Sequence, residues 1–195
     1  RIRPPVDFDK FASEKSILFI TTSPVKKALH GLANIFVSQA ISELFTIADE
    51  SAAGALEIPT DIIFDDFATG AKVSDMPEKL SICRAKGIAF SGILLQSESQ
   101  LKRMYGEYEA IEIIDQCDSY VFFGGNNYET AKALSLKMNV PLDEILYLPV
   151  GRIIVFRRGQ KPVFSTRYDI FHDEFYQRIT QSHTGQKDDP WPRDR

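Results

Sequence analysis

Two adjacent acids follow a short apolar run in the stretch DIIFDDFATG, residues 61–70. The run has the character of a buried strand, and Asp65 and Asp66 come directly after it. An acid in this position can hold Mg²⁺ through water, while a second acid beside it can orient an attacking water. The alternative is that the two acids cap a helix or lie in a solvated turn, and the stretch by itself favours neither interpretation.

Two further strand ends carry polar or glycine-rich chemistry. Gln96 follows the apolar run GILL, and the segment GGNN, residues 124–127, follows YVFF. A glutamine at such a position can contact a terminal phosphate without adding charge. Because ligands of parallel sheets bind beyond the carboxyl ends of the strands, we expect all three ends to face one edge if the strands are parallel.

The positions of these residues depend on alternating strands and helices. Apolar runs predict strands, and apolar residues at helical spacing predict helices between them. The predicted strands are 16–22, 61–67, 89–96 and 119–125; the predicted helices follow Pro24 and cover about 77–86, 99–116 and 128–138, with a helical turn in 141–148. Parallel strands need such long connections, so the fold class is α/β with a mostly parallel sheet flanked by helices.

The end of the chain has a different pattern. RIIVFRRG, residues 152–159, and PVFSTRYDI, residues 162–170, predict an antiparallel hairpin at one edge of the sheet. Beyond about Thr180 few residues are apolar. We therefore expect one domain over residues 1–180 and a flexible tail over 181–195.

Composition limits the function classes. The content of 44 % hydrophobic residues is typical of a globular protein. Because the net charge is −4, the protein as a whole does not attract nucleic acid or anionic membranes electrostatically. Cys83 and Cys117 lie far apart and lack metal-ligand spacing, so a zinc site is not expected. No apolar run approaches 18 residues, and we expect no part of this chain to cross a membrane.

Basic residues occur in two places of interest. Arg84 and Lys86 end a predicted helix, where cations are favourable, but an arginine here could also reach a neighbouring subunit's nucleotide. The predicted hairpin concentrates Arg152, Arg157, Arg158, Lys161 and Arg167, either as solvated charge or as a contact to DNA phosphates. The phosphate-binding motif GxxxxGK[ST] does not occur in the 195 residues.

The order of motifs resembles a known family. ASEKSILFITT, IIFDDFA, RAKGIAFSGILLQSESQLKRMYG, CDSYVFFGGNNYETAKALS and RGQKPVFSTRYDI together resemble the C-terminal part of the TraG/TraD-type conjugative coupling proteins of type IV secretion. The similarity covers roughly residues 11–175. It implies a RecA-like P-loop NTPase domain that is incomplete in this chain, since the family's P-loop, membrane helices and all-α domain precede the matched region.

The resemblance also implies roles for single residues. Asp65 matches the magnesium-associated acid of the Walker B strand, and Asp66 stands where the family carries a glutamate that polarises water. Gln96 matches the glutamine that senses the γ-phosphate, and Arg84 lies in the region of the arginine that acts on a neighbouring subunit. Asp66 is one methylene shorter than glutamate, so hydrolysis is expected to be slow or to need another base.

For the complete protein, the resemblance implies a homo-hexamer that uses ATP and Mg²⁺, binds DNA without sequence preference and passes relaxase-bound DNA to the type IV secretion channel. It implies a location at the cytoplasmic side of the inner membrane through an N-terminal anchor absent here, and an inactive ATPase in this chain alone. The alternative is a nucleotide-independent docking module for relaxosome accessory proteins. A metal-dependent phosphoesterase using Asp61, Asp65 and Asp66 ranks last, because it leaves Gln96 and GGNN unexplained.

Overall fold

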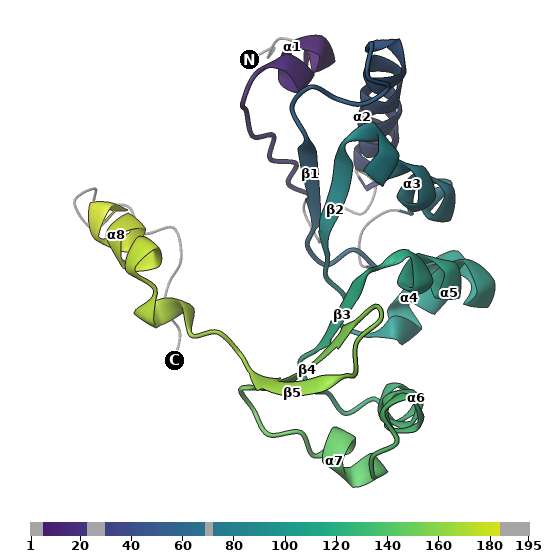
Figure 1. Cartoon of the computed structure of the whole chain (residues 1–195), viewed down its shortest axis with the longest axis vertical. Coiled ribbons are helices and arrows are strands. Elements are labelled where there is room, and N and C mark those ends of the chain that lie inside the picture. The colour runs from purple at the N-terminus through teal and green to yellow at the C-terminus, as the bar shows by residue number, and fades with distance from the viewer. Residues whose placement is uncertain (1–5, 23–29, 69–71, 184–195) are drawn as a thin grey trace. The chain divides into compact units, whose positions relative to one another are not determined.

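The computed structural model describes residues 6–22, 30–68 and 72–183, without the side chains of 181–183 (Figure 1). The chain divides into two compact units, Arg1–Asp118 and Ser119–Arg195. Each unit has its own hydrophobic core.

The first unit is built on a parallel pair of strands. Its elements are α1 (Phe8–Ser13), α2 (His30–Glu50), β1 (Thr60–Phe64), α3 (Met76–Cys83), the 3-10 turn η2 (Arg84–Lys86), β2 (Ile88–Ile93), α4 (Glu98–Tyr105) and α5 (Glu107–Gln116). β1 and β2 run parallel, with Thr60 opposite Ile88 and Phe64 opposite Ile93. Because α3 and η2 lie between them in the chain, they form the strand, helix and strand unit that the sequence predicts.

In the first unit, the side chains buried between helices and strands are those that the spacing of apolar residues in the sequence predicts to be buried. Ile41 of α2, Leu101 of α4 and Ile113 of α5 are at most 2 % exposed and share one cluster, against which strand residues Ile62 and Phe90 pack. A second cluster joins α1, α2 and β2, and it includes the free thiol of Cys83. Burial raises the pKa of that thiol above its ordinary value.

The prediction of one long helix over residues 99–116 is wrong in one respect, because two helices occupy this range. α4 ends at Tyr105 and α5 begins at Glu107. Gly106 between them has φ 88° and ψ 168°, a conformation that is almost restricted to glycine. A residue in this conformation cannot continue a helix, so the chain turns and starts a new one.

The strand predicted over residues 16–22 is not observed. This segment follows α1 as extended chain without a strand partner in the described residues, and Ile17 and Phe19 are 80 % and 84 % exposed. An apolar run has strand propensity, but it becomes a strand only where a neighbouring backbone completes its hydrogen bonds. The helix predicted after Pro24 is described from His30 onward, and its beginning lies outside the described residues.

The second unit contains a three-stranded antiparallel sheet. Its elements are β3 (Ser119–Phe122), α6 (Tyr128–Met138), α7 (Leu142–Leu146), β4 (Arg152–Arg157), β5 (Val163–Thr166), the 3-10 turn η3 (Ile170–His172) and α8 (Glu174–His183). The order β3-β4-β5 confirms the predicted hairpin, formed by β4 and β5. β3 was expected in the parallel sheet, but its described partner is β4, to which it pairs antiparallel.

The core of the second unit lies between this sheet and α6 and α7. Ile145 and Ile154 are fully buried and Phe122 nearly so, together with Ala131 and Leu134 of α6. The chain is therefore α/β as predicted, with a parallel pair in one unit and an antiparallel hairpin in the other.

Two helices, α2 and α8, are relevant to the expectations of no membrane-spanning segment and of a flexible tail over residues 181–195. By length and composition α2 could cross a membrane, but a core helix passes the same test, and Ile41, Leu44 and Ala48 of α2 are buried in the first unit. α8 continues to His183, into the range 181–195 that was expected to be a flexible tail. The rest of that range, 184–195, lies outside the described residues.

Candidate functional site

The acidic pair lies in a turn at the carboxyl end of β1. Asp65 and Asp66 are both exposed, and Asp66 has the left-handed value φ 50°. Aspartate and asparagine tolerate this region better than other residues with a side chain, because their short polar groups bond locally. The turn therefore directs two carboxylates into solvent immediately beyond the strand.

Gln96 lies beside Asp66, as the parallel arrangement predicts. Its Nε2 donates a hydrogen bond to Asp66 Oδ1 at 3.2 Å, and its Oε1 accepts one from Gln100 Nε2 at 3.1 Å. Gln100 belongs to the first turn of α4, so the helix that follows β2 helps to orient the glutamine. Two of the predicted site residues, from neighbouring strand ends, are thus brought into direct contact.

Backbone bonds and an aromatic stack hold this turn against the core. The Leu94 N–H donates to Phe64 O at 2.9 Å, and the Phe67 N–H donates to Leu94 O at 3.0 Å, which extends the pairing of β1 and β2 past both strand ends. The buried Phe67 ring stacks on Tyr105 of α4 with centroids 5.7 Å apart. The position of Asp66 is therefore fixed by the residue that follows it.

Tyr105 also fixes the chain on the far side of the turn. Its hydroxyl accepts a hydrogen bond from the Val73 N–H at 3.0 Å and lies 3.2 Å from Val73 O, to which it donates. Burial raises the pKa of Tyr105 to about 12, so the hydroxyl stays protonated at neutral pH.

Arg84 is not brought to the acids within the chain. It precedes β2 in η2, whereas Asp66 and Gln96 follow the strands at the opposite end of the parallel pair. Its neighbour Lys86 forms an ion pair with Asp49 of α2. A role for Arg84 toward a neighbouring subunit remains a prediction.

Asp61 is also distant from the acidic pair. It is the second residue of β1, and its Oδ1 accepts a hydrogen bond from Ser91 Oγ of β2 at 2.7 Å. Four residues of extended strand separate it from Asp65, about 13 Å. This separation argues against a phosphoesterase that uses Asp61 together with Asp65 and Asp66.

The donor set fits Mg²⁺ held through water. Mg²⁺ in nucleotide sites keeps several waters and takes one or two carboxylates together with phosphate oxygens. Asp65 and Asp66 supply exposed carboxylates, and Gln96 adds a neutral amide beside them. When bound, the metal would neutralise phosphate charge, and the protein residues would orient water and phosphate around it.

The GGNN segment lies in the second unit. Asn127 caps α6 by accepting a hydrogen bond from the Thr130 N–H at 2.9 Å, while Gly124, Gly125 and Asn126 line a cavity of about 330 Å³. The same cavity is lined by Arg152 and Arg167 of the hairpin. Whether GGNN shares an edge with Asp66 remains a prediction, but the cavity was not foreseen.

Comparison with known proteins matches this chain to conjugative coupling proteins. Residues 59–138 match the family described as the TraM recognition site of TraD and TraG. This range runs from just before β1 to the end of α6, so it contains Asp65, Asp66, Gln96 and GGNN. No curated protein sequence is similar enough to count as a match.

Solved structures of the bacterial coupling protein TrwB have the same fold. The unbound protein is 22 % identical with a TM-score of 0.59, and the complexes with the ATP analogue ADPNP and with ADP and Mg²⁺ are each 23 % identical with a TM-score of 0.59. In each case 71 % of this chain is covered. The chain spans only 36–37 % of the TrwB chains that it matches.

The family match contains the acidic pair, the glutamine and the glycine-rich strand end, and the fold match extends over most of the chain. Both agree with the resemblance that the sequence motifs indicate. The family match over residues 59–138 and the shared fold therefore support the interpretation of this chain as the C-terminal part of a conjugative coupling protein of the TraG/TraD type.

Proposed function

We propose that this chain is the C-terminal motor and substrate-recognition region of a coupling protein that uses ATP hydrolysis to deliver relaxase-bound DNA to the conjugation channel. The observation that carries the proposal is the contact between Asp66 and Gln96 at 3.2 Å. It joins an acid and a neutral amide from adjacent parallel strands at the edge where α/β folds bind ligands. The TrwB structures with ADPNP and with ADP and Mg²⁺ support it, because they share this fold.

Each residue has a distinct part in the proposed ATP site. Asp65 holds Mg²⁺ through water, Asp66 orients the attacking water, and Gln96 contacts the γ-phosphate as a neutral donor. The hydrogen bond from Gln96 fixes the orientation of the Asp66 carboxylate. Arg84, at the other end of β2, serves the nucleotide of a neighbouring subunit in a homo-hexamer.

The proposal extends to the surroundings of the complete motor. Its partners are DNA, bound without sequence preference, together with relaxase and channel components, and it works at the cytoplasmic face of the inner membrane. The phosphate cradle comes from outside these 195 residues, in which GxxxxGK[ST] does not occur.

The test is made in a coupling protein that carries this region. Asp65→Ala and Gln96→Ala should each abolish ATP-driven DNA transfer and leave the thermal stability of the protein unchanged, since both side chains are exposed. The matched control is Asp61→Ala, an exposed acid of the same strand at the opposite end, which should transfer normally. Normal transfer by either of the first two variants would mean that the substituted residue is an ordinary surface residue and has no part in the ATP site.

The chain alone gives a second test. Purified residues 1–195 should show no magnesium-dependent ATP hydrolysis, because a site with acids but without a phosphate cradle cannot hold the nucleotide. Robust turnover that is lost in Asp65→Ala would mean that the nucleotide is held by residues not identified here. It would contradict the division of the site proposed above.

A second function is favoured by the family description, which names a TraM recognition site. We infer a docking surface for a relaxosome accessory protein on residues 59–138, used without nucleotide. A purified accessory protein of the TraM type should be retained by the chain in the absence of ATP. No retention at high micromolar concentration would count against docking.

A further inference from the structure

Gln100 lies behind Gln96 in the first turn of α4 and is partly buried. Its Nε2 donates to Gln96 Oε1 at 3.1 Å, and Gln96 Nε2 donates in turn to Asp66 Oδ1 at 3.2 Å. Within the described residues, Gln100 Oε1 is buried and accepts no hydrogen bond. The three side chains therefore form a row of two hydrogen bonds that begins at a buried oxygen and ends at an exposed carboxylate.

The carboxylate sets the direction of both hydrogen bonds. An ionised carboxylate only accepts, so the Gln96 group that faces Asp66 is the amide nitrogen. The amide oxygen of Gln96 then faces Gln100, which has to turn its own nitrogen toward that oxygen. This arrangement gives each bond one donor and one acceptor, and it turns the oxygen of Gln100 away from the row.

The buried oxygen of Gln100 is a cost that packing alone does not explain. A buried acceptor without a donor destabilises a folded protein, because it has given up its hydrogen bonds with water. An apolar side chain of similar length, such as methionine, would avoid this cost. The bond that Gln100 makes in return goes to Gln96, which is exposed and could bond to water instead.

We propose that Gln100 is a positioning residue for the ATP site. It holds the amide of Gln96 with the nitrogen toward Asp66 and toward the γ-phosphate. That nitrogen carries two hydrogens, of which one bonds to Asp66 and the other is the donor to phosphate. With the amide turned over, its oxygen would face the carboxylate and the phosphate, and the negative charges would repel it. The role of the phosphate in this inference rests on the function proposed above.

Gln100→Glu tests the orientation with almost no change in size. Because a carboxylate cannot donate, Gln96 should turn over and donate to it. In a complete coupling protein that carries this region, kcat for ATP hydrolysis should fall about 10–100-fold, since an oriented donor is lost. Inhibition by ADP should be unchanged, because ADP has no γ-phosphate for Gln96 to contact.

Two further variants calibrate this loss. Gln100→Met leaves Gln96 free to keep its bond to Asp66, so kcat should fall only about 2–10-fold, the factor that corresponds to one net hydrogen bond. Gln39→Glu is the matched control, because it makes the same change at an exposed position of α2. It should hydrolyse ATP at the unaltered rate.

A double substitution shows whether Gln100 acts through Gln96. In a protein that already carries Gln96→Ala, Gln100→Glu should cause no further loss of ATP hydrolysis, because the group that it misdirects is gone. Losses that multiply in the double variant would mean that Gln100 affects hydrolysis by another route. They would overturn the proposal.

The purified chain gives two readouts that need no nucleotide. Gln100→Met removes the buried oxygen, so its melting temperature should equal or exceed that of the unaltered chain. In nuclear magnetic resonance spectra, the side-chain amide signals of Gln96, assigned by their loss in Gln96→Ala, should shift in Gln100→Glu. They should stay in place in Gln39→Glu.

Three results from the single variants would also overturn the proposal. The first is a lower melting temperature of Gln100→Met, which would make Gln100 a structural residue. The second is an unshifted Gln96 amide in Gln100→Glu, and the third is an unaltered hydrolysis rate in Gln100→Glu while Gln96→Ala is inactive. Normal hydrolysis by Gln96→Ala would instead contradict the ATP site itself, and the amide signals would then decide separately whether Gln100 orients Gln96.

Discussion

Asp66 combines an unusual backbone conformation with the central contact of the proposed site. Its positive φ suits aspartate and asparagine, and its carboxylate accepts the hydrogen bond from Gln96. A longer acid at this position would carry its carboxylate farther from the turn but would lose the local tolerance of the left-handed region. The aspartate is therefore compatible with the turn that directs the acids beyond β1.

Substitutions of Asp66 should separate the conformational role from the chemical one. Asp66→Asn keeps the tolerated conformation and an oxygen acceptor for Gln96, so the melting temperature should stay within about 1–2 °C. Asp66→Val places a β-branched residue at φ 50° and should cost about 1–3 kcal/mol. Thermal unfolding followed by circular dichroism measures both; equal melting temperatures would mean that the turn relaxes without strain.

Tyr105 predicts a pH dependence of stability at alkaline pH. Its pKa in the folded chain is about 12, above the ordinary value of 10. Above pH 10 the unfolded chain loses the hydroxyl proton first, so the stabilisation that is complete below pH 10 is lost as the pH rises toward 12. The stability difference between the unaltered chain and Tyr105→Phe should therefore shrink by up to about 2 kcal/mol between these pH values.

Denaturant unfolding of both proteins across that range tests this expectation. Below pH 10, Tyr105→Phe should be less stable by about 1–3 kcal/mol, because the buried Val73 N–H loses its acceptor. Tyr108→Phe, at an exposed tyrosine of α5, is the control and should leave the pH profile unchanged. A stability difference that stays constant up to pH 12 would contradict the buried, protonated hydroxyl.

At the scale of elements, the break between α4 and α5 determines how these two helices pack in the first unit. α4 carries Gln100 and Tyr105 toward the acidic turn, whereas α5 contributes Ala110 and Ile113 to the core. A continuous helix could not present both sets in these directions, because its faces are fixed by one axis. Gly106 therefore positions the helix that supports the site.

Gly106→Ala should destabilise the chain through the backbone alone. A Cβ at this position meets no atom within 4 Å, but φ 88° with ψ 168° is nearly restricted to glycine, so the cost is about 1–3 kcal/mol. Gly31→Ala in α2 is the control; its Cβ is equally unobstructed and its helical backbone favours alanine, so stability should be equal or higher. Melting temperatures that change equally in both would show that the conformation of Gly106 is not required.

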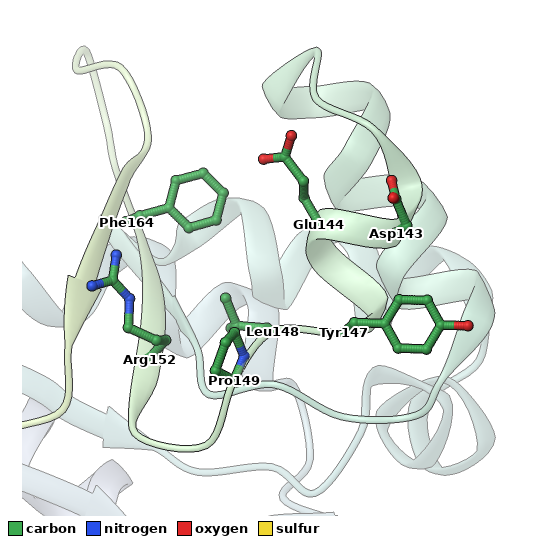
Figure 2. A pocket seen from close by; sticks show the side chains of 7 residues that line it. All are labelled: Asp143, Glu144, Tyr147, Leu148, Pro149, Arg152 and Phe164. Atoms are coloured by element: carbon green, nitrogen blue, oxygen red, sulfur yellow. The ribbon is translucent and has the colours of Figure 1, made fainter.

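At the scale of the whole molecule, the chain consists of two units with separate cores. Leu101 in the first and Ile154 in the second are both fully buried. The acidic turn belongs to one unit. The other contains the cavity beside GGNN and a second cavity, of about 440 Å³, between α7 and the hairpin, which is shown in Figure 2. The acidic turn and the cavities therefore depend on different cores.

Core substitutions should show this division. Ile154→Ala should cost about 2–5 kcal/mol and accelerate amide hydrogen exchange in α6, β3 and β4, while exchange in α4 and α5 stays unchanged. Leu101→Ala should have the reverse pattern. Acceleration of exchange throughout the chain by either variant would instead indicate a single cooperative unit.

The sequence predicts the contact between Asp66 and Gln96, but it does not predict the residues that hold the acidic turn in place. Asp66 and Gln96 both follow apolar runs, so parallel pairing of those runs was sufficient to bring them together. The role of Tyr105 depends on a hydrogen bond to a residue 32 positions earlier, which helical spacing does not encode. The same holds for the cavity beside GGNN, which Arg152 and Arg167 line from the hairpin.

The errors at the level of elements have physical causes. Residues 16–22 have strand propensity, but propensity does not supply a hydrogen-bonding partner. Gly106 could have indicated a helix end, since glycine followed by the acid Glu107 is typical of one helix ending and another beginning. β3 was assigned to the parallel sheet because it follows a helix, although its described partner comes later in the chain.

The two cysteines differ in burial in a way that allows one of them to be labelled selectively. Cys83 is buried and its pKa is raised, so it forms the reactive thiolate slowly, whereas Cys117 is only partly buried and stands one residue before the end of the first unit. A maleimide dye should therefore attach to Cys117 without any engineered cysteine. Because the sequence contains one tryptophan, energy transfer from Trp191 to such a dye would report the distance between these two positions without any substitution.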